Sequence, residues 1–361
     1  MLHQAWRGGS RMEDGNRRYE IRSYQDVLDW KVTNADRLHS ASEDEIRQGL
    51  TTDVYFVKTY EILKELGLLQ KKVTAEIFAS RAGVAAGIEE CINLLKGREL
   101  QIWGIPEGEA FSAKEVVMRI EGQYADFGLY ETALLGMLAS ASGWATAARE
   151  IKMVAGNRPV ICFGSRHVHP AVAPVMERAA MVAGVDGASC ILGAKLLGVN
   201  PRGTIPHAAM LLAGDTLEVA LTFDRIMPAD ETRIVLVDTF KDEAEEALRV
   251  AGEMKERLHS IRLDTPSERG GVTPALVREV RARLDLAGFS HVGIFVTGGL
   301  TPDRIPSLIE AGATGFGVGS YISGAPPIDM TMDIKEIEGQ PVAKRGRIPG
   351  LTPSDRLVRL Q

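Results

Sequence analysis

Between residues 38 and 122 the hydrophobic positions first follow a helical period and then a strand-like period. Ser42 has a glutamate three residues later, which is the signature of a capped helix start, and an amphipathic run over 51–68 predicts a second helix. Residues 71–79 then alternate apolar and polar positions, and residues 100–122 have the pattern of strand, turn and strand. This pattern predicts a small α+β unit, which we interpret as a sandwich domain.

From residue 123 to residue 323 helical stretches alternate with short, continuously apolar strands. The pattern predicts helices at 124–140, 143–156, 169–184, 242–258, 273–288 and 301–312, and about six strands at 159–164, 187–190, 232–240, 260–265, 291–299 and 314–320. Strands and helices that alternate at this spacing form parallel βαβ units, and continuously apolar strands are buried on both faces. We therefore expect an α/β fold with an irregular or incomplete parallel, TIM-like barrel rather than an open Rossmann sheet.

The segments at the two ends complete the plan of the chain. Residues 1–37 are polar and have no sustained apolar period, which predicts an extension or loosely ordered arm. After Ser323 the sequence is irregular, but residues 328–337 alternate again and predict a strand that returns to the first domain. The expected plan is an N-terminal extension at 1–37, a sandwich domain at 38–122 that is completed by 324–361, and a barrel domain at 123–323.

Composition and charge exclude several classes of function. The 42 Lys and Arg against 48 Asp and Glu give a net charge of -6, which lacks the positive excess of a nucleic-acid binder. The three cysteines are far apart and form no CxxC pair, which fits a reducing compartment and excludes a four-cysteine zinc site. No stretch reaches ~18 consecutive apolar residues and the N-terminus has no apolar core of a signal peptide, so we expect a cytoplasmic protein.

Polar residues and glycines follow most of the predicted strands directly. In a parallel barrel the ligand lies at the carboxyl ends of the strands, so these residues are the candidates for a functional site. They are Phe163, Gly164, Ser165, Arg166 and His167; Ser189; Thr204 and His207; Asp238 and Thr239; Arg262 and Asp264; Thr297, Gly298 and Gly299; and Gly317, Gly319 and Ser320.

The last two groups form a pair of glycine clusters, in VTGGL and in GFGVGS. Backbone N–H groups of such turns can converge on an anion, which predicts a sugar-phosphate site. A tight strand-to-helix turn would explain either cluster alone. Two clusters at successive strands favour the phosphate site.

Arg166 and Arg262 come at the ends of apolar strands, where a long cation needs an anion close by. A guanidinium matches a carboxylate or a pyrophosphate in a bidentate manner, and the alternative is an internal salt bridge to Asp264 or Asp238. The two aspartates end neighbouring strands. They would hold a hydrated magnesium ion or face a developing sugar cation, or else cap the helices that follow.

His207 follows GTIP, where glycine and proline shape a loop. A histidine there can act as a base, as a phosphate acceptor or as a hydrogen-bond donor, and the alternative is a purely structural role. His167 and His169 are spaced like a metal pair, but they have no third ligand at a reasonable spacing and Pro170 follows them. Metal binding through histidine is therefore not expected.

Taken together, these segments resemble nicotinate phosphoribosyltransferase of the type II phosphoribosyltransferase fold, in the shorter form of archaea and some bacteria. The resemblance extends from about Leu38 to Gly346, through TTDVYFVKTYEIL, LYETALLG, SGWATAAREIK, CFGSRHVHPAVAPVMERAA, GVDGASCILGAKLLG, GTIPHA, VDTFKDEAEEAL, IRLDT, VTGGL and GFGVGSYI in the expected order. It implies transfer of the phosphoribosyl group of phosphoribosyl pyrophosphate to nicotinate, which gives nicotinate mononucleotide and pyrophosphate for NAD synthesis. It also implies magnesium as cofactor, and ATP as a co-substrate whose hydrolysis is coupled or stimulatory.

The resemblance further implies roles for individual residues. His207 matches the histidine that ATP phosphorylates, and Tyr55 and Phe163 match residues that sandwich the pyridine ring, with Tyr55 supplied by the other subunit of a homodimer or higher oligomer. The two arginines match those around the nicotinate carboxylate and the phosphoribosyl donor. The implied sets are catalytic residues His207, Asp264 and Asp238; nicotinate-binding residues Tyr55, Phe163, Arg166, Ser189 and Arg262; and residues for the phosphoribosyl donor Arg166, Arg262, Thr204, Thr297, Gly298, Gly299, Gly317, Gly319 and Ser320.

Two features bear on the substrate and on the limits of the resemblance. Related nicotinamide-using enzymes carry an aspartate near the ring amide where this chain has Ser189, and an aspartate would repel nicotinate. No cysteine follows Cys190, so we expect no zinc module at the C-terminus. The alternatives are quinolinate phosphoribosyltransferase, whose second carboxylate calls for more basic residues than Arg166, His167 and Arg262 supply, and a non-catalytic nucleotide-sensing barrel.

Overall fold

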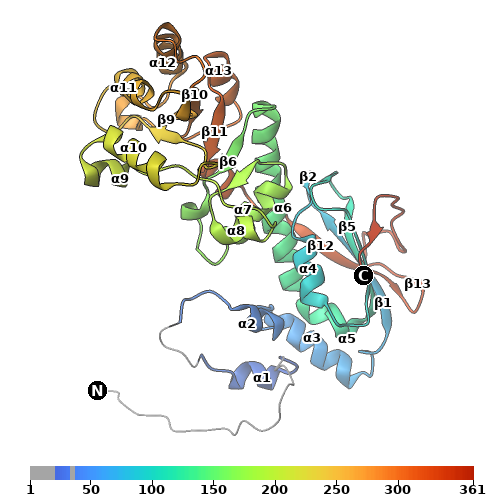
Figure 1. Ribbon diagram of the computed structural model, residues 1–361. Helices are drawn as coiled ribbons and strands as arrows, with labels where there is room; N and C mark the ends of the chain where they lie inside the picture. The colour runs from blue at the N-terminus through green and yellow to red at the C-terminus, as the bar shows by residue number, and fades with distance from the viewer. Residues whose placement is uncertain (1–20, 33–36) are drawn as a thin grey trace, which may run out of the picture. The chain divides into compact units, whose positions relative to one another are not determined.

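The computed structural model of the protein describes residues 21–32 and 37–361, which divide into two compact units. The first unit takes in the described part of Met1–Lys71 together with Gln123–Ala133, and the second takes in Lys72–Gly122 and Leu134–Gln361. Tyr55 belongs to the first unit, whereas the predicted strand-end residues all belong to the second. Figure 1 shows the elements of each unit in chain order.

The first unit is built from short helices that carry strong start signals. They are α1 (Tyr24–Asp29), α2 (Glu43–Arg47), α3 (Val54–Glu65), α5 (Tyr124–Phe127) and the 3-10 turn η1 (Gly128–Tyr130). The Ser42 hydroxyl accepts from the Glu45 N–H and the Glu45 carboxylate accepts from the Ser42 N–H, which confirms the predicted start of α2. Helix α1 corrects the prediction of a loose arm: its own capping box at Ser23 orders this part of 1–37. Residues 1–20 and 33–36 lie outside the described residues.

One sheet of the second unit is antiparallel and combines strands that lie before the half-barrel in the sequence with strands that lie after it. Its order is β13-β12-β1-β5-β3-β14, with β1 (Lys72–Ala79), β3 (Gln101–Gly104), β5 (Val116–Gln123), β12 (Met330–Ile337), β13 (Gln340–Pro341) and β14 (Val358–Arg359). The alternation over 328–337 correctly predicts β12, which pairs with β1 over the register Val73–Ile337 to Ala79–Met330. Strands β2 (Gly83–Val84) and β4 (Ala110–Phe111) form a separate pair, and helix α4 (Ile88–Leu95) was not predicted.

The larger sheet of the second unit is parallel and forms a curled half-barrel. It confirms the six predicted strands, in the order β7-β6-β11-β10-β9-β8, with β6 (Val160–Cys162), β7 (Gly187–Ala188), β8 (Ile234–Leu236), β9 (Ser260–Leu263), β10 (Gly293–Val296) and β11 (Gly315–Val318). The end strands β7 and β8 do not pair with each other, so the barrel is incomplete. The chain between them forms no strand and instead makes α8 (Ile191–Lys195), α9 (His207–Ala213) and α10 (Thr216–Ile226).

The two faces of the half-barrel differ in how much apolar surface they bury. Helices α7 (Ala173–Val182), α11 (Glu243–Met254), α12 (Pro274–Leu286) and α13 (Ile305–Glu310) share the large core with one face of the strands. On the other face, Ile161, Ile234 and Phe295 form a small cluster against which Phe163 packs. Because side chains alternate along a strand, Arg262 stands on this second face between the buried Ile261 and Leu263.

The helix α6 (Glu131–Ala155) corrects one prediction. Residues 124–140 and 143–156 were expected to form two helices, but α6 runs without a break through Gly143. A Cβ at Gly143 would lie 2.5 Å from the Pro326 carbonyl oxygen, so this glycine permits close packing inside a helix and does not end it. No helix among the described residues combines the length and the apolar character that crossing a membrane requires.

Candidate active site at the carboxyl edge of the half-barrel

Arg262 is the centre of a network that joins three of the predicted segments. Its Nη2 lies 2.6 Å from Asp264 Oδ2, its Nη1 donates to Thr204 Oγ1 at 2.7 Å, and its Nε donates to Thr297 Oγ1 at 2.9 Å. Thr297 in turn donates to the other oxygen of Asp264 at 2.7 Å. Burial lowers the pKa of Arg262, while Asp264 and Asp238 act in the opposite direction. The ends of β9 and β10 and the loop before α9 are thus held together by one guanidinium.

Phe163 and the two glycine clusters surround this network. The Arg262 Cζ lies 5.8 Å from the centroid of the Phe163 ring. The centroids of the Phe163 and Phe295 rings are 6.3 Å apart. A Cβ at Gly317 would lie 2.5 Å from Phe163 and 2.6 Å from Thr297. Position 317 must therefore be glycine for the aromatic ring and the Arg262 network to share this edge.

The loop after β10 has two successive glycines with positive φ. Gly298 has φ 93° and Gly299 has φ 57°, conformations that residues with a Cβ rarely adopt. Arg304 Nη1 donates to the carbonyl oxygens of both glycines, at 3.1 Å and 2.6 Å. Because N–H and C=O point in opposite directions across a peptide, the N–H that follows each of these carbonyls faces away from Arg304.

Asp238 and His207 form a second pair at this edge. The His207 Nε2 lies 3.5 Å from Asp238 Oδ1, and the Asp238 side chain is 1% exposed. This is an ion-pair distance, and neither oxygen of Asp238 has a hydrogen-bond partner among the described residues. Burial raises the pKa of Asp238, with His207 acting to lower it and Asp264 to raise it. Asp238 is therefore a buried acceptor whose lone pairs are available to a ligand.

Arg166 and His167 follow β6 and are more exposed than Arg262. Arg166 Nε donates to His167 Nε2 at 3.4 Å, and His167 Nδ1 lies 3.2 Å from Ser323 Oγ. Burial, followed by the charge of Arg166, lowers the pKa of His167. A Cβ at Gly319 would lie 2.6 Å from the His167 ring, so the second glycine cluster also borders this group.

The sequence analysis missed Glu177 on α7, which is fully buried. Its Oε1 accepts from the Ser165 N–H at 3.1 Å, the Ser165 hydroxyl at 2.6 Å and the Ser189 hydroxyl at 2.9 Å, and its Oε2 accepts from the Cys190 N–H at 2.6 Å. The signal that could have found it is a charged residue on the apolar face of a predicted helix, at the spacing Ala173, Glu177, Ala180.

The structure thus brings most of the predicted residues together and separates others. Arg262, Asp264, Thr204, Thr297 and Phe163 are in mutual contact. Ser189 contacts Glu177, and Ser320 begins the short helix α14 (Ser320–Ser323). Thr239 is half-buried, and its hydroxyl oxygen is buried without a hydrogen-bond partner among the described residues. Tyr55 is half exposed in the other unit, so its predicted place against the pyridine ring stays a prediction.

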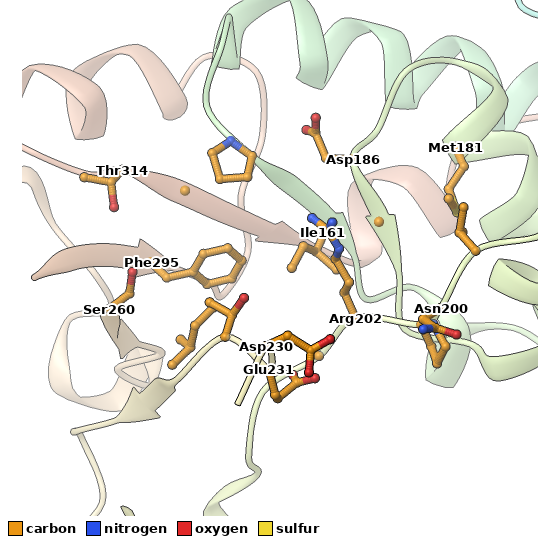
Figure 2. A pocket seen from close by; sticks show the side chains of 18 of the residues that line it. Ile161, Met181, Asp186, Asn200, Arg202, Asp230, Glu231, Ser260, Phe295 and Thr314 are labelled. Atoms are coloured by element: carbon orange, nitrogen blue, oxygen red, sulfur yellow. The ribbon is translucent and has the colours of Figure 1, made fainter. Parts of the chain in front are cut away.

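A pocket lies at the opposite edge of the half-barrel. It is a cavity of about 720 Å³ near the amino ends of the strands, with Ser260 of β9 and Gly315 of β11 in its wall. Figure 2 shows Phe295 and Ile161 pointing into it and Arg202, Asp230 and Glu231 at its rim. None of the predicted catalytic residues lines this cavity.

Comparison with known proteins identifies the family. The family model for the N-terminal domain of quinolinate phosphoribosyl transferase matches residues 53–142, and the model for its C-terminal domain matches residues 144–333. This chain belongs to the quinolinate phosphoribosyl transferase family. It is a type II phosphoribosyltransferase of NAD biosynthesis, with the α/β half-barrel of that family and a smaller N-terminal domain.

Individual relatives carry two different names. A crystal structure of nicotinate-nucleotide pyrophosphorylase from Pyrococcus furiosus is 46% identical, covers 88% of this chain and 82% of that chain, and has a TM-score of 0.82. Nicotinate phosphoribosyltransferase of Mycobacterium tuberculosis is 29% identical over 339 residues, which cover 82% of this chain and 74% of that protein. The structure of human nicotinic acid phosphoribosyltransferase, at 16% identity, covers 83% of this chain and 77% of that chain with a TM-score of 0.63, and shows the fold alone.

Proposed function

We propose that this phosphoribosyltransferase acts on nicotinate, joining its ring nitrogen to the phosphoribosyl group of phosphoribosyl pyrophosphate. The products are nicotinate mononucleotide and pyrophosphate. ATP hydrolysis is coupled to the transfer or stimulates it. The name of the mycobacterial relative supports the choice of nicotinate.

The observation that carries the choice of a monocarboxylate is the number of positive charges left for a ligand. Arg262 is already paired with Asp264 at 2.6 Å. His167 accepts from Arg166 through Nε2 and has a lowered pKa, so its imidazole is neutral at neutral pH. Of the two strand-end arginines, Arg166 alone has no carboxylate partner among the described residues, and one guanidinium matches one carboxylate.

The remaining groups fit the rest of the substrate pair. Phe163 offers an aromatic surface for a pyridine ring, next to the cationic edge made by Arg262. The outward-facing N–H groups of Gly299 and Leu300 suit the 5′-phosphate of the sugar. Arg166 would then hold the nicotinate carboxylate and orient the ring nitrogen toward C1′ of the ribose.

In the transfer step, a bond forms between the ring nitrogen and C1′ while the bond from C1′ to the pyrophosphate oxygen breaks. The ribose carries cationic character at that moment, and the carboxylates of Asp264 and Asp238 would stabilise it electrostatically. The ring nitrogen has no proton to lose, so the step needs no general base. The chain's task is to hold the two reactants in line and to exclude water.

Magnesium, which the resemblance implies, is compatible with the residues present. Both oxygens of Asp238 are buried without hydrogen-bond partners in the described structure, as a carboxylate facing a cation would be. No group of three or more His, Cys, Asp or Glu able to hold a metal exists among the described residues, which suits an ion held by one carboxylate and the substrate phosphates. When bound, magnesium would neutralise charge on the pyrophosphate leaving group.

In this proposal His207 serves the ATP reaction. Its Nε2 faces Asp238, which leaves Nδ1 as the nitrogen that can attack the γ-phosphate of ATP. A nitrogen–phosphorus bond would form as the bond to the ADP oxygen breaks, and water would later hydrolyse the phosphohistidine to phosphate. Asp238 would stabilise the cationic imidazole between these events.

Quinolinate is the second candidate substrate. The family model bears that name, and the relative at 46% identity is named nicotinate-nucleotide pyrophosphorylase. Quinolinate carries two carboxylates, one of which leaves as carbon dioxide. It would require a further cation beside Arg166.

Incubation of the purified protein with phosphoribosyl pyrophosphate and radiolabelled nicotinate, quinolinate or nicotinamide, with and without ATP, tests the proposal. We expect mononucleotide from nicotinate, faster with ATP, and none from the other two. Mononucleotide formed only from quinolinate, with release of carbon dioxide, would overturn the choice of substrate. Binding without any product would favour the sensing role instead.

A further inference from the structure

Glu177 is a buried carboxylate that forms no ion pair with a cation among the described residues. The four groups that donate to it are two backbone N–H groups and two hydroxyls, all within 3.1 Å. A buried charge is costly unless hydrogen bonds satisfy it, and here they occupy both oxygens. The contacts therefore form a complete local network.

The donors come from two loops that are far apart in the sequence. Ser165 lies three residues after Cys162, the last residue of β6, whereas Ser189 and Cys190 directly follow the end of β7. Glu177 sits on α7, the helix that connects these two strands. One side chain thus fixes the carboxyl ends of two neighbouring strands to each other.

Ser165 directly precedes Arg166, so its two hydrogen bonds to Glu177 set where the Arg166 backbone lies. The hydroxyl of Ser189 donates its proton to Glu177 and has none left for a ligand. Among these residues, recognition of a ligand carboxylate then falls to Arg166. The role that the resemblance implies for Ser189 becomes indirect, through Glu177.

We propose that Glu177 is a positioning residue for the pyridine acid: it anchors the loop that presents Arg166 and holds the 189–190 turn clear of the ring. This inference rests on the proposed function, because it assumes that Arg166 binds the ring carboxylate. Among the described residues, Glu177 makes no hydrogen bond with the loops after β10 and β11, so we expect its loss to affect the pyridine acid more than the phosphoribosyl donor.

The test is the substitution Glu177→Gln in the full chain. Glutamine keeps the shape but has one acceptor oxygen, and its amide N–H would face one of the present donors. We expect the KM for the pyridine acid to rise about 10-fold or more, with the KM for phosphoribosyl pyrophosphate within about 2-fold of wild type. Ser165→Ala should raise the same KM by about 3-fold, and Ser165→Thr, which keeps the hydroxyl, should restore it.

Glu76→Gln is the matched control. Glu76 is also a buried glutamate, and it accepts from Arg119 at 2.6 Å and from the Thr352 N–H at 3.1 Å in the antiparallel sheet. We expect it to lower the melting temperature and to leave both KM values unchanged. If Glu177→Gln also changes only the melting temperature, or raises both KM values equally, the positioning role is wrong.

The substrate in this test is whichever pyridine acid the wild-type protein converts. If the wild-type protein converts quinolinate alone, the proposed function is wrong. The effect of Glu177→Gln is then measured on the KM for quinolinate. If Glu177→Gln does not fold, the pair Ser165→Ala and Ser165→Thr decides. If wild type converts neither acid, equilibrium dialysis of labelled nicotinate against wild type and Glu177→Gln replaces the kinetics, and equal binding or no binding to either overturns the inference.

Discussion

The two edges of the half-barrel make opposite use of polar residues. At the carboxyl edge Arg262 binds three side chains within 2.9 Å, and four donors converge on Glu177. At the amino edge Arg202, Asp230 and Glu231 line a cavity of about 720 Å³, and their side chains make no hydrogen bond or ion pair with the described residues. The cavity is at the amino edge, but the convergent polar groups are at the carboxyl edge.

This difference shows that a site is marked by preorganised groups rather than by empty space. Side chains that already hold one another in place lose little conformational entropy when a substrate binds. Their interactions can therefore stabilise the transition state. Parallel strands bring their carboxyl ends together and leave the ends of helices and loops there for chemistry. Substitutions at the two edges should therefore differ sharply in effect.

The largest effect is expected for Arg262→Ala. The change removes the contacts with Asp264, Thr204 and Thr297 together and leaves the half-buried carboxylate of Asp264 without its cation. We expect kcat/KM to fall by about 1,000-fold, measured as mononucleotide formation with both substrates varied. A loss below about 10-fold would mean that the network does not serve the reaction.

Asp238→Asn should lower activity and raise stability. Because burial raises the pKa of Asp238, at pH values between the ordinary and the raised pKa the native state binds a proton that the unfolded chain has released. The free energy of unfolding thus falls as pH rises from the ordinary value of 3.8 through the raised value, and stays lower above it.

We expect about 100-fold lower kcat and about 1 kcal/mol greater stability for Asp238→Asn at pH 8, with the stability difference shrinking toward pH 4. Urea unfolding at both pH values measures the difference. His207 and Asp264 are the charged groups that face Asp238, so His207→Ala with Asp238→Asn controls for the histidine. Equal stability of wild type and Asp238→Asn at pH 8 would contradict the unpaired state of this carboxylate.

His207→Ala should separate the ATP reaction from the transfer itself. Without an imidazole no phosphohistidine can form, so ATP stimulation should disappear while basal transfer stays within about 10-fold of wild type. Initial rates with and without ATP give the ratio directly. An unchanged response to ATP would remove the proposed role of His207.

The smallest effect is expected for Arg202→Ala at the amino edge. Its guanidinium has no partner among the described residues, and it lines the cavity rather than the network. We expect kcat and both KM values to change by less than about 2-fold. A large loss of activity here would break the comparison, since it would give the amino edge a part in the reaction.

The sequence could predict which residues follow the strands because a strand end is a local feature of the sequence. Each short apolar run ends at a polar residue, and parallel pairing places all those ends at one edge whatever the exact register. The sequence left open whether Arg262 faces a ligand or an internal carboxylate. The structure pairs Arg262 with Asp264. This pairing depends on side-chain geometry, which the spacing of residues in the sequence does not determine.

Other features were out of reach because they depend on contacts between distant segments. Gly143 looks like a helix break until Pro326 is seen against it. The gap between β7 and β8 exists because the chain between them forms α8, α9 and α10 and no strand. A short apolar run in the sequence does not distinguish a short helix from a strand. Glu177 was missed because it lies on a helix and not at a strand end.

The pairing of β12 with β1 has a consequence for biosynthesis. Val73 and Ile337 are register partners although most of the half-barrel lies between them in the sequence. On the ribosome, β1 emerges before the half-barrel, and its edge stays unpaired until residues 330–337 have been translated. Premature termination before residue 330 would leave that edge open to aggregation, so chaperone dependence should be greatest for truncated nascent chains.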